Sequence, residues 1–150
     1  MSSELSITQD PTGFSKSFTT KFLNDPNTEF FFHKIELADK QIISIHTNGI
    51  IDTTFEIPMS TKATINYASS MELDGETVGI PEPVLLVGDH ANMKIQVVAS
   101  QIAKLIALQH PKSTVLSIGS RWFGRGDEVE ESDFEKCLFV IENVKKLFQI

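Results

Sequence analysis

The side chains that most often carry out chemistry are few and scattered along this sequence. Four histidines, His33, His46, His90 and His110, include no pair at the three- or four-residue spacing with which a helix presents two metal ligands. The single cysteine, Cys137, excludes an intrachain disulfide and a cysteine zinc site. It falls inside an expected helix, where a small buried apolar role is usual. We therefore predict no catalytic residue, no metal site and no cofactor.

The glycine-rich stretch from Gly119 to Gly126 is the natural place to look for a nucleophile or a phosphate-binding loop. Gly119-Ser120 follows an expected strand but lacks the G-x-S-x-G pattern of a nucleophile elbow. The stretch also lacks a Walker lysine, and it continues into Asp127-Glu128, whose charges repel phosphate. We expect that the protein is not an enzyme. A small enzyme using this loop is kept as an alternative, which a ligand-induced rise in melting temperature would support.

One segment does carry residues suited to recognition. Arg121-Trp122-Phe123-Gly124-Arg125 contains the only tryptophan and both arginines of the chain. Tryptophan and arginine are the residues most enriched at binding hot spots. Two interpretations are open: the aromatic pair folds back onto the core, or the segment contacts a partner. In the second case Arg121, Trp122, Phe123 and Arg125 form a partner-binding site.

Composition limits the classes of partner. The 150 residues are 41% hydrophobic and 22% charged, as expected for one globular domain, and include 11 phenylalanines. The net charge of −7 argues against nucleic acids and anionic membrane surfaces, which are bound through Lys and Arg. No run approaches the roughly 18 apolar residues of a membrane span. The N-terminus lacks the pattern of a signal peptide. We expect a cytoplasmic and also nuclear location.

The remaining sequence predicts the scaffold. Residues 1–13 are polar and are expected to be a flexible segment, followed by a single domain over residues 14–150. Residues 14–23 are ambiguous, with strand favoured, and the acidic stretch around Glu72 and Asp74 is expected to be an exposed loop. Strands are predicted at 29–37, 41–47 and 50–57, the last two joined as a hairpin by Asn48-Gly49.

The second half predicts a strand at 84–87, a helix at 93–109 and a buried strand at 114–118. A C-terminal helix is expected to begin at a capping box of Ser132 and Glu135 and to run to about Phe148. Its predicted apolar stripe is Phe134, Leu138, Ile141, Val144 and Phe148, and further apolar residues widen it. Hairpins followed by helices predict an α+β fold, an antiparallel sheet with two main helices packed on one face.

The segments QIISIHTNGIIDTTFEI, PVLLVGD, QVVASQIAKLI, TVLSIGS and DFEKCLFVIENVKKLF resemble the small proteasome-assembly chaperones of the third and fourth types, fungal members especially. The resemblance covers roughly residues 30–148, and NGIIDTTFEI favours the third type, whereas VGIPEPVLLVGD also suits the fourth. It implies a non-enzymatic α+β domain that pairs with a paralogous assembly chaperone. The heterodimer would hold a proteasome α-type subunit during assembly of the 20S α-ring.

The resemblance carries over no binding residues, so the site at Arg121–Arg125 remains a hypothesis from the residues alone. A longin- or roadblock-like scaffold subunit in trafficking or signalling, with a similar mixture of strands and helices, is the alternative that its partners would distinguish.

Overall fold

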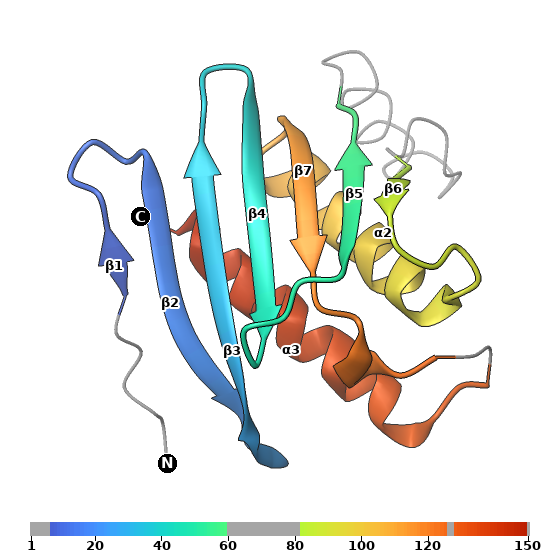
Figure 1. The fold of residues 1–150 in the computed structure, drawn as a ribbon. Coiled ribbons are helices and arrows are strands. Elements are labelled where there is room, and N and C mark those ends of the chain that lie inside the picture. The colour runs from blue at the N-terminus through green and yellow to red at the C-terminus, as the bar shows by residue number, and fades with distance from the viewer. Residues whose placement is uncertain (1–6, 60–81, 126–127, 150) are drawn as a thin grey trace.

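The computed structural model describes residues 7–59, 82–125 and 128–149. It consists of a single mixed sheet with helices on one side (Figure 1). The elements are β1 (Thr8–Gln9), β2 (Ser15–Phe22), β3 (Asp25–Glu36), β4 (Lys40–Thr47), β5 (Thr53–Ile57), β6 (Val84–Val87), α2 (Met93–Gln109), β7 (Ser113–Ile118), the 3₁₀ turn η1 (Arg121–Phe123) and α3 (Glu131–Phe148). The strand favoured for residues 14–23 is present as β2, whereas the predicted acidic loop lies outside the described residues. The flexibility of residues 1–13 stays a prediction.

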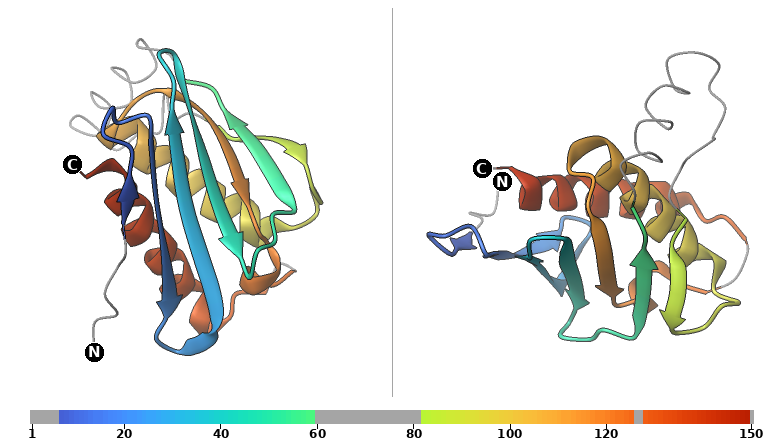
Figure 2. Two further views of the ribbon diagram at one scale, coloured as in Figure 1. Left: turned by 60° about the vertical axis from the view of Figure 1, so that its left-hand side comes forward. Right: turned by 90° about the horizontal axis from the view of Figure 1, so that it is seen from above.

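The seven strands lie in the order β1-β2-β3-β4-β7-β5-β6. All neighbours are antiparallel except β4 and β7, which run parallel. Helices α2 and α3 both cover the same face of this sheet (Figure 2). The predicted α+β class, with two main helices on one face, is confirmed.

The predicted hairpin at Asn48-Gly49 is only partly correct. Both residues have positive φ, 50° and 78°, and Thr47 and Ile50 exchange backbone hydrogen bonds of 3.2 and 3.0 Å across the turn. The pairing of residues 41–47 with 50–57 is nevertheless wrong, because β7 lies between them and pairs with both β4 and β5. The turn residues specify only a local reversal of the chain, and a strand from far along the sequence occupies the place beside β4.

The core forms where the inner face of the sheet meets α2. The helix bounds agree with the predicted 93–109, Asn92 caps its start by accepting from the Ile95 N–H, and His110 ends it before Pro111. The apolar residues of α2 that recur at spacings of three and four are all buried: Ile95, Val98, Ala99, Ile102, Leu105 and Ile106. Its partners on the sheet are buried aromatic and branched residues, chiefly Phe18, Phe30, Phe32, Ile43, Ile45, Phe55, Ile57, Leu116 and Ile118.

Helix α3 departs from the prediction at its first half. Its capping box uses Glu130 and Asp133 in place of Ser132 and Glu135, so the helix begins two residues earlier than predicted, at Glu131. The buried apolar residues are Val140, Val144 and Leu147, whereas Phe134 is 74% exposed. The period of 3.6 residues locates apolar faces, but it cannot say which of two such faces meets the core.

Gly119 permits a close crossing of two chain segments. A Cβ at this position would lie 2.6 Å from the Ile50 carbonyl oxygen and 3.1 Å from Thr47 Oγ1. The Gly119 N–H also donates to the Ile45 carbonyl, which fixes the end of β7 beside β4. The absence of a side chain is therefore a requirement of the β4–β7 pairing.

We expect Gly119→Ala to lower the free energy of unfolding by about 1 to 3 kcal/mol, because the added methyl group must displace backbone. Urea denaturation followed by circular dichroism measures this change. The matched control is Gly49→Asn, since asparagine tolerates positive φ and no atom lies within 4 Å of that position. An equally small effect of both substitutions would contradict the packing argument.

Candidate interaction surfaces

The predicted site at Arg121–Arg125 divides into buried and exposed residues. Phe123 is 3% exposed and belongs to the core. Trp122 is half-buried, with its ring centroid 4.6 Å from that of Phe30, and its indole N–H donates to Asp25 over 3.2 Å. The Lys136 ammonium lies 5.1 Å from the centroid of the same indole and donates to the Trp122 carbonyl. The aromatic pair therefore anchors this turn to the sheet and to α3.

The two arginines of the segment remain on the surface. Arg121 is exposed, and the Arg125 side chain is 76% exposed while it pairs with Asp89. The hydrogen bond from Arg125 is the main cause that holds the pKa of Asp89 below its usual range. The structure therefore leaves Arg121 and Arg125 available for a partner and does not leave Phe123 available.

The sheet face opposite the helices is a second candidate surface, and no helix of the described residues covers it (Figure 2). Ile35 on β3, Ile42 on β4 and Val115 on β7 are in register on three neighbouring strands, and all three are half-buried. Phe31 extends this apolar row along β3. We call these four residues the open-face row. The sequence analysis did not predict this row, because the alternation of side chains along one strand does not show that both faces of the sheet carry apolar residues.

Two histidines lie next to the open-face row. His46 is paired with Phe31 across β3 and β4, with ring centroids 5.3 Å apart, and His33 follows two residues along β3. Burial is the larger cause that lowers the pKa of His46, and the charge of His33 adds to it. At neutral pH His46 is therefore uncharged, so covering this face does not require a buried imidazolium.

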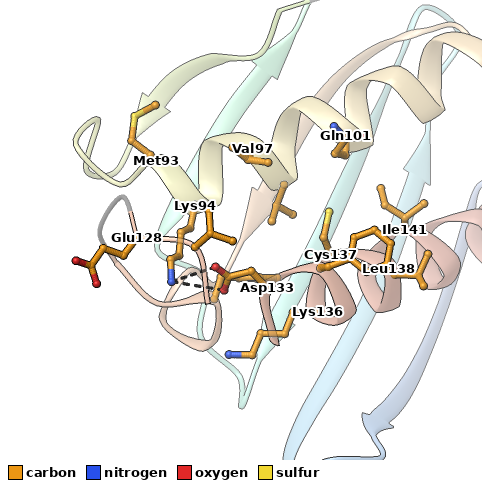
Figure 3. A pocket seen from close by; sticks show the side chains of 14 residues that line it. Met93, Lys94, Val97, Gln101, Glu128, Asp133, Lys136, Cys137, Leu138 and Ile141 are labelled. Atoms are coloured by element: carbon orange, nitrogen blue, oxygen red, sulfur yellow. Dashed lines mark hydrogen bonds and ion pairs between the residues drawn. The ribbon is translucent and has the colours of Figure 1, made fainter. Parts of the chain in front are cut away.

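A third candidate is a groove of about 560 Å³ between α2 and α3 (Figure 3). The two helices run in the same direction, because Lys94 and Asp133 are 3.3 Å apart at their N-terminal ends, whereas His110 and Phe148 have ring centroids 5.6 Å apart at their C-terminal ends. The lining is mostly apolar, with Met93, Val97 and Val98 on α2 and Phe134, Cys137, Leu138 and Ile141 on α3. The sequence indicated an apolar surface here, because the apolar stripe predicted for the last helix is wider than a single contact face requires.

The described part of the chain offers no arrangement for a metal, since no group of three His, Cys, Asp or Glu side chains gathers closely enough there. None of the helices described is both long and apolar enough to cross a membrane. Burial raises the pKa of the Cys137 thiol, so this group is poorly suited to act as a nucleophile.

The sequence matches a protein-family model, 20S proteasome chaperone assembly proteins 3 and 4, over residues 1–145. The chain belongs to this family. The fold is similar to a chain in a crystal structure of a novel chaperone complex for yeast 20S proteasome assembly, with a TM-score of 0.63 and 22% sequence identity, covering 90% of this chain and 98% of that one. No match was found among curated protein sequences.

Membership confirms the resemblance seen in the sequence and favours the chaperone interpretation over the trafficking scaffold. The family description covers both types, so the leaning to the third type stays a prediction. A family of assembly chaperones also suggests a role without catalysis.

We expect Trp122→Ala to lower the free energy of unfolding by about 2 to 3 kcal/mol, because it removes the centre of an aromatic cluster. This loss is somewhat smaller than the loss expected for a fully buried aromatic side chain, since Trp122 is half-buried. Urea denaturation is the measurement. Arg121→Ala is the neighbouring control and should change stability by no more than about 0.5 kcal/mol. Wild-type stability of the Trp122 variant would show that the ring acts only at the surface.

We also expect stability to fall as the pH is lowered through about 6.5, the ordinary histidine value. The folded-state pKa of His46 is depressed, so the unfolded chain binds a proton first and folding loses free energy until the folded pKa is reached. His46→Gln should flatten this part of the profile of unfolding free energy against pH. His90→Gln, in an exposed loop, is the control, and an unchanged profile in the His46 variant would refute the assignment.

Proposed function

We propose that the protein is one subunit of a two-chaperone complex that binds a proteasome α-type subunit and promotes correct assembly of the 20S α-ring. The observation that carries this proposal is the family match over residues 1–145. The role requires surfaces for two different proteins, a paralogous chaperone and a client, and it requires no catalytic residue. We propose the cytoplasm, and the nucleus as well, as the place of action, which imaging of the tagged chain tests.

For the paralogue we propose the open-face row as the contact. Two sheets that face one another pack through interdigitated side chains about 10 Å apart, so half-buried apolar residues in register on neighbouring strands suit such a contact. Burying more of Ile35, Ile42 and Val115 provides a driving force of roughly 25 cal/mol for each Å² of apolar surface removed from water. The neutral state of His46 keeps the desolvation cost low.

For the client we propose Arg121 and Arg125. Both are exposed, and the turn between them is held by Trp122 and Phe123, so the guanidinium groups are presented from a fixed backbone. Arginine contributes strongly at interfaces through planar, multiple hydrogen bonds. In this proposal the aromatic residues of the segment position the arginines, whereas the arginines contact the client.

Affinity purification of the tagged chain from its own cells, followed by mass spectrometry, tests both contacts. We expect recovery of a similar-sized paralogue together with α-type subunits and without mature proteasome. Phe31→Thr combined with Ile42→Thr should weaken pairing at least tenfold, about 1.4 kcal/mol, because the apolar row is interrupted. Arg121→Ala combined with Arg125→Ala should reduce α-type subunits and leave the paralogue unchanged.

Leu23→Thr is the matched control, since Leu23 is 83% exposed and lies in the turn after β2. Recovery of trafficking proteins and no proteasome subunit would overturn the proposed function. Normal pairing of the Phe31 and Ile42 variant would overturn only the assignment of the open face.

A further inference from the structure

The groove between α2 and α3 exposes more apolar surface than a solvated helix pair requires. Val97 is 54% exposed, Phe134 is 74% exposed and Leu138 is 45% exposed, and the three line the same groove. Contiguous apolar surface of this kind marks interaction sites. The two helices that line the groove lie on one side of the sheet (Figure 2), so the groove is separate from the open-face row on the other side.

The spacing of the walls suits a helix as the occupant. Met93, Val97 and Gln101 repeat every four residues along α2, and Phe134, Leu138 and Ile141 repeat every three or four along α3. Both rows line one channel, in which Figure 3 shows Val97 and Gln101 on α2 opposite Leu138 and Ile141 on α3. Helix α2 has 17 residues and is about 25 Å long, enough to support roughly four turns of a third helix. Helix-in-groove recognition uses anchors with this same spacing on the ligand.

The charge at one end of the groove selects the kind of helix. Glu128, Glu130, Glu131 and Asp133 gather where α3 begins, and Lys94 engages Glu130 at 3.5 Å and Asp133 at 3.3 Å. Lys136 also lines this end of the groove, but the four carboxylates still outnumber the two ammonium groups. Basic residues on an occupant are attracted there, whereas a second copy of this chain, with net charge −7 and the same carboxylates, is repelled. An anionic lipid surface is repelled for the same reason.

We propose that the groove between α2 and α3 binds an amphipathic helix of a partner protein, whose apolar residues occupy the channel and whose basic residues lie at the end where both helices begin. The groove and the open-face row are on opposite sides of the sheet, so both can be occupied at once. Binding in the groove does not depend on the proposed pairing with a paralogue.

The test uses the full chain and synthetic 18-residue peptides labelled with fluorescein. The probe has leucine at helical spacing on one face, lysine at the polar positions of one half and glutamine at the others. One control peptide has the same composition in an order that scatters the leucines, and another replaces every lysine with glutamate. Fluorescence anisotropy should show at least tenfold tighter binding of the probe than of either control.

Two protein variants locate the contact. Phe134→Asp should weaken probe binding at least tenfold without unfolding the chain, because Phe134 is largely exposed. Glu128→Lys combined with Glu131→Lys should weaken the lysine probe and strengthen the glutamate peptide, because the sign of the groove end is reversed. Both residues are exposed and lie outside the capping box. Leu23→Asp, in the exposed turn after β2 and outside the groove lining, should change nothing.

Cys137 provides a direct readout within the groove, since it is the single cysteine and lines the channel. The probe should slow alkylation of Cys137, and the scattered peptide should not. Equal binding of all three peptides, or full alkylation under saturating probe, would overturn the proposal. Two further results would also overturn it. If the wild-type chain self-associates and Phe134→Asp abolishes this, the groove binds a second copy. If the wild-type chain binds phosphatidylserine vesicles and Phe134→Asp abolishes this, the groove binds lipid.

Discussion

The parallel pairing of β4 with β7 is the constraint on which the rest of the molecule depends. A parallel neighbour cannot be reached by a tight turn. The chain returns along β5 and runs out again along β6, so it must cross the sheet once more before β7 begins. Helix α2 makes this crossing and buries its stripe on the face that it spans. Helix α3 follows and lies beside α2 on the same face. One face of the sheet is therefore covered by helices, and the other is left open.

Aromatic residues then divide between the two faces according to strand alternation. Phe30 and Phe32 point inward and are fully buried, whereas Phe31 points to the open face and is half-buried. The inward group continues through Trp122 to Phe139 on α3, so aromatic packing joins β3, η1 and α3 into one unit. The many phenylalanines thus serve a core and also contribute to a surface.

The sequence was sufficient where the pattern is local. The apolar period of α2, its start after Asn92 and its end before Pro111 all depend on neighbouring residues, and the helix was predicted at its observed bounds. The hairpin partner of β4 was wrong because strand order is decided by distant packing around β7. The stripe predicted for α3 was correct only in its second half, where Val144 is buried and Ile141 and Phe148 pack against the core. Phe134 and Leu138 are exposed, and only tertiary structure shows which part of the stripe meets the core.

The same reasoning explains why the candidate surfaces were harder to predict than the scaffold. The Arg121–Arg125 segment was found from residue types, but their types could not tell that Phe123 would be buried while the arginines remained exposed. The open-face row joins β3, β4 and β7, and the groove joins α2 and α3, so neither surface exists within one continuous stretch of sequence.

The two surfaces also differ in the physics of binding. The open-face row is apolar and includes a neutral imidazole beside it, so a contact there depends little on salt and suits a lasting association. The groove combines apolar walls with an excess of exposed carboxylates at one end, and interactions of exposed charges are screened within about 10 Å at 0.1 M ionic strength. A ligand in the groove therefore associates faster, and it dissociates more easily than a partner bound to the open-face row. An assembly factor that stays paired while its other contacts are made and broken requires this kind of division between its surfaces.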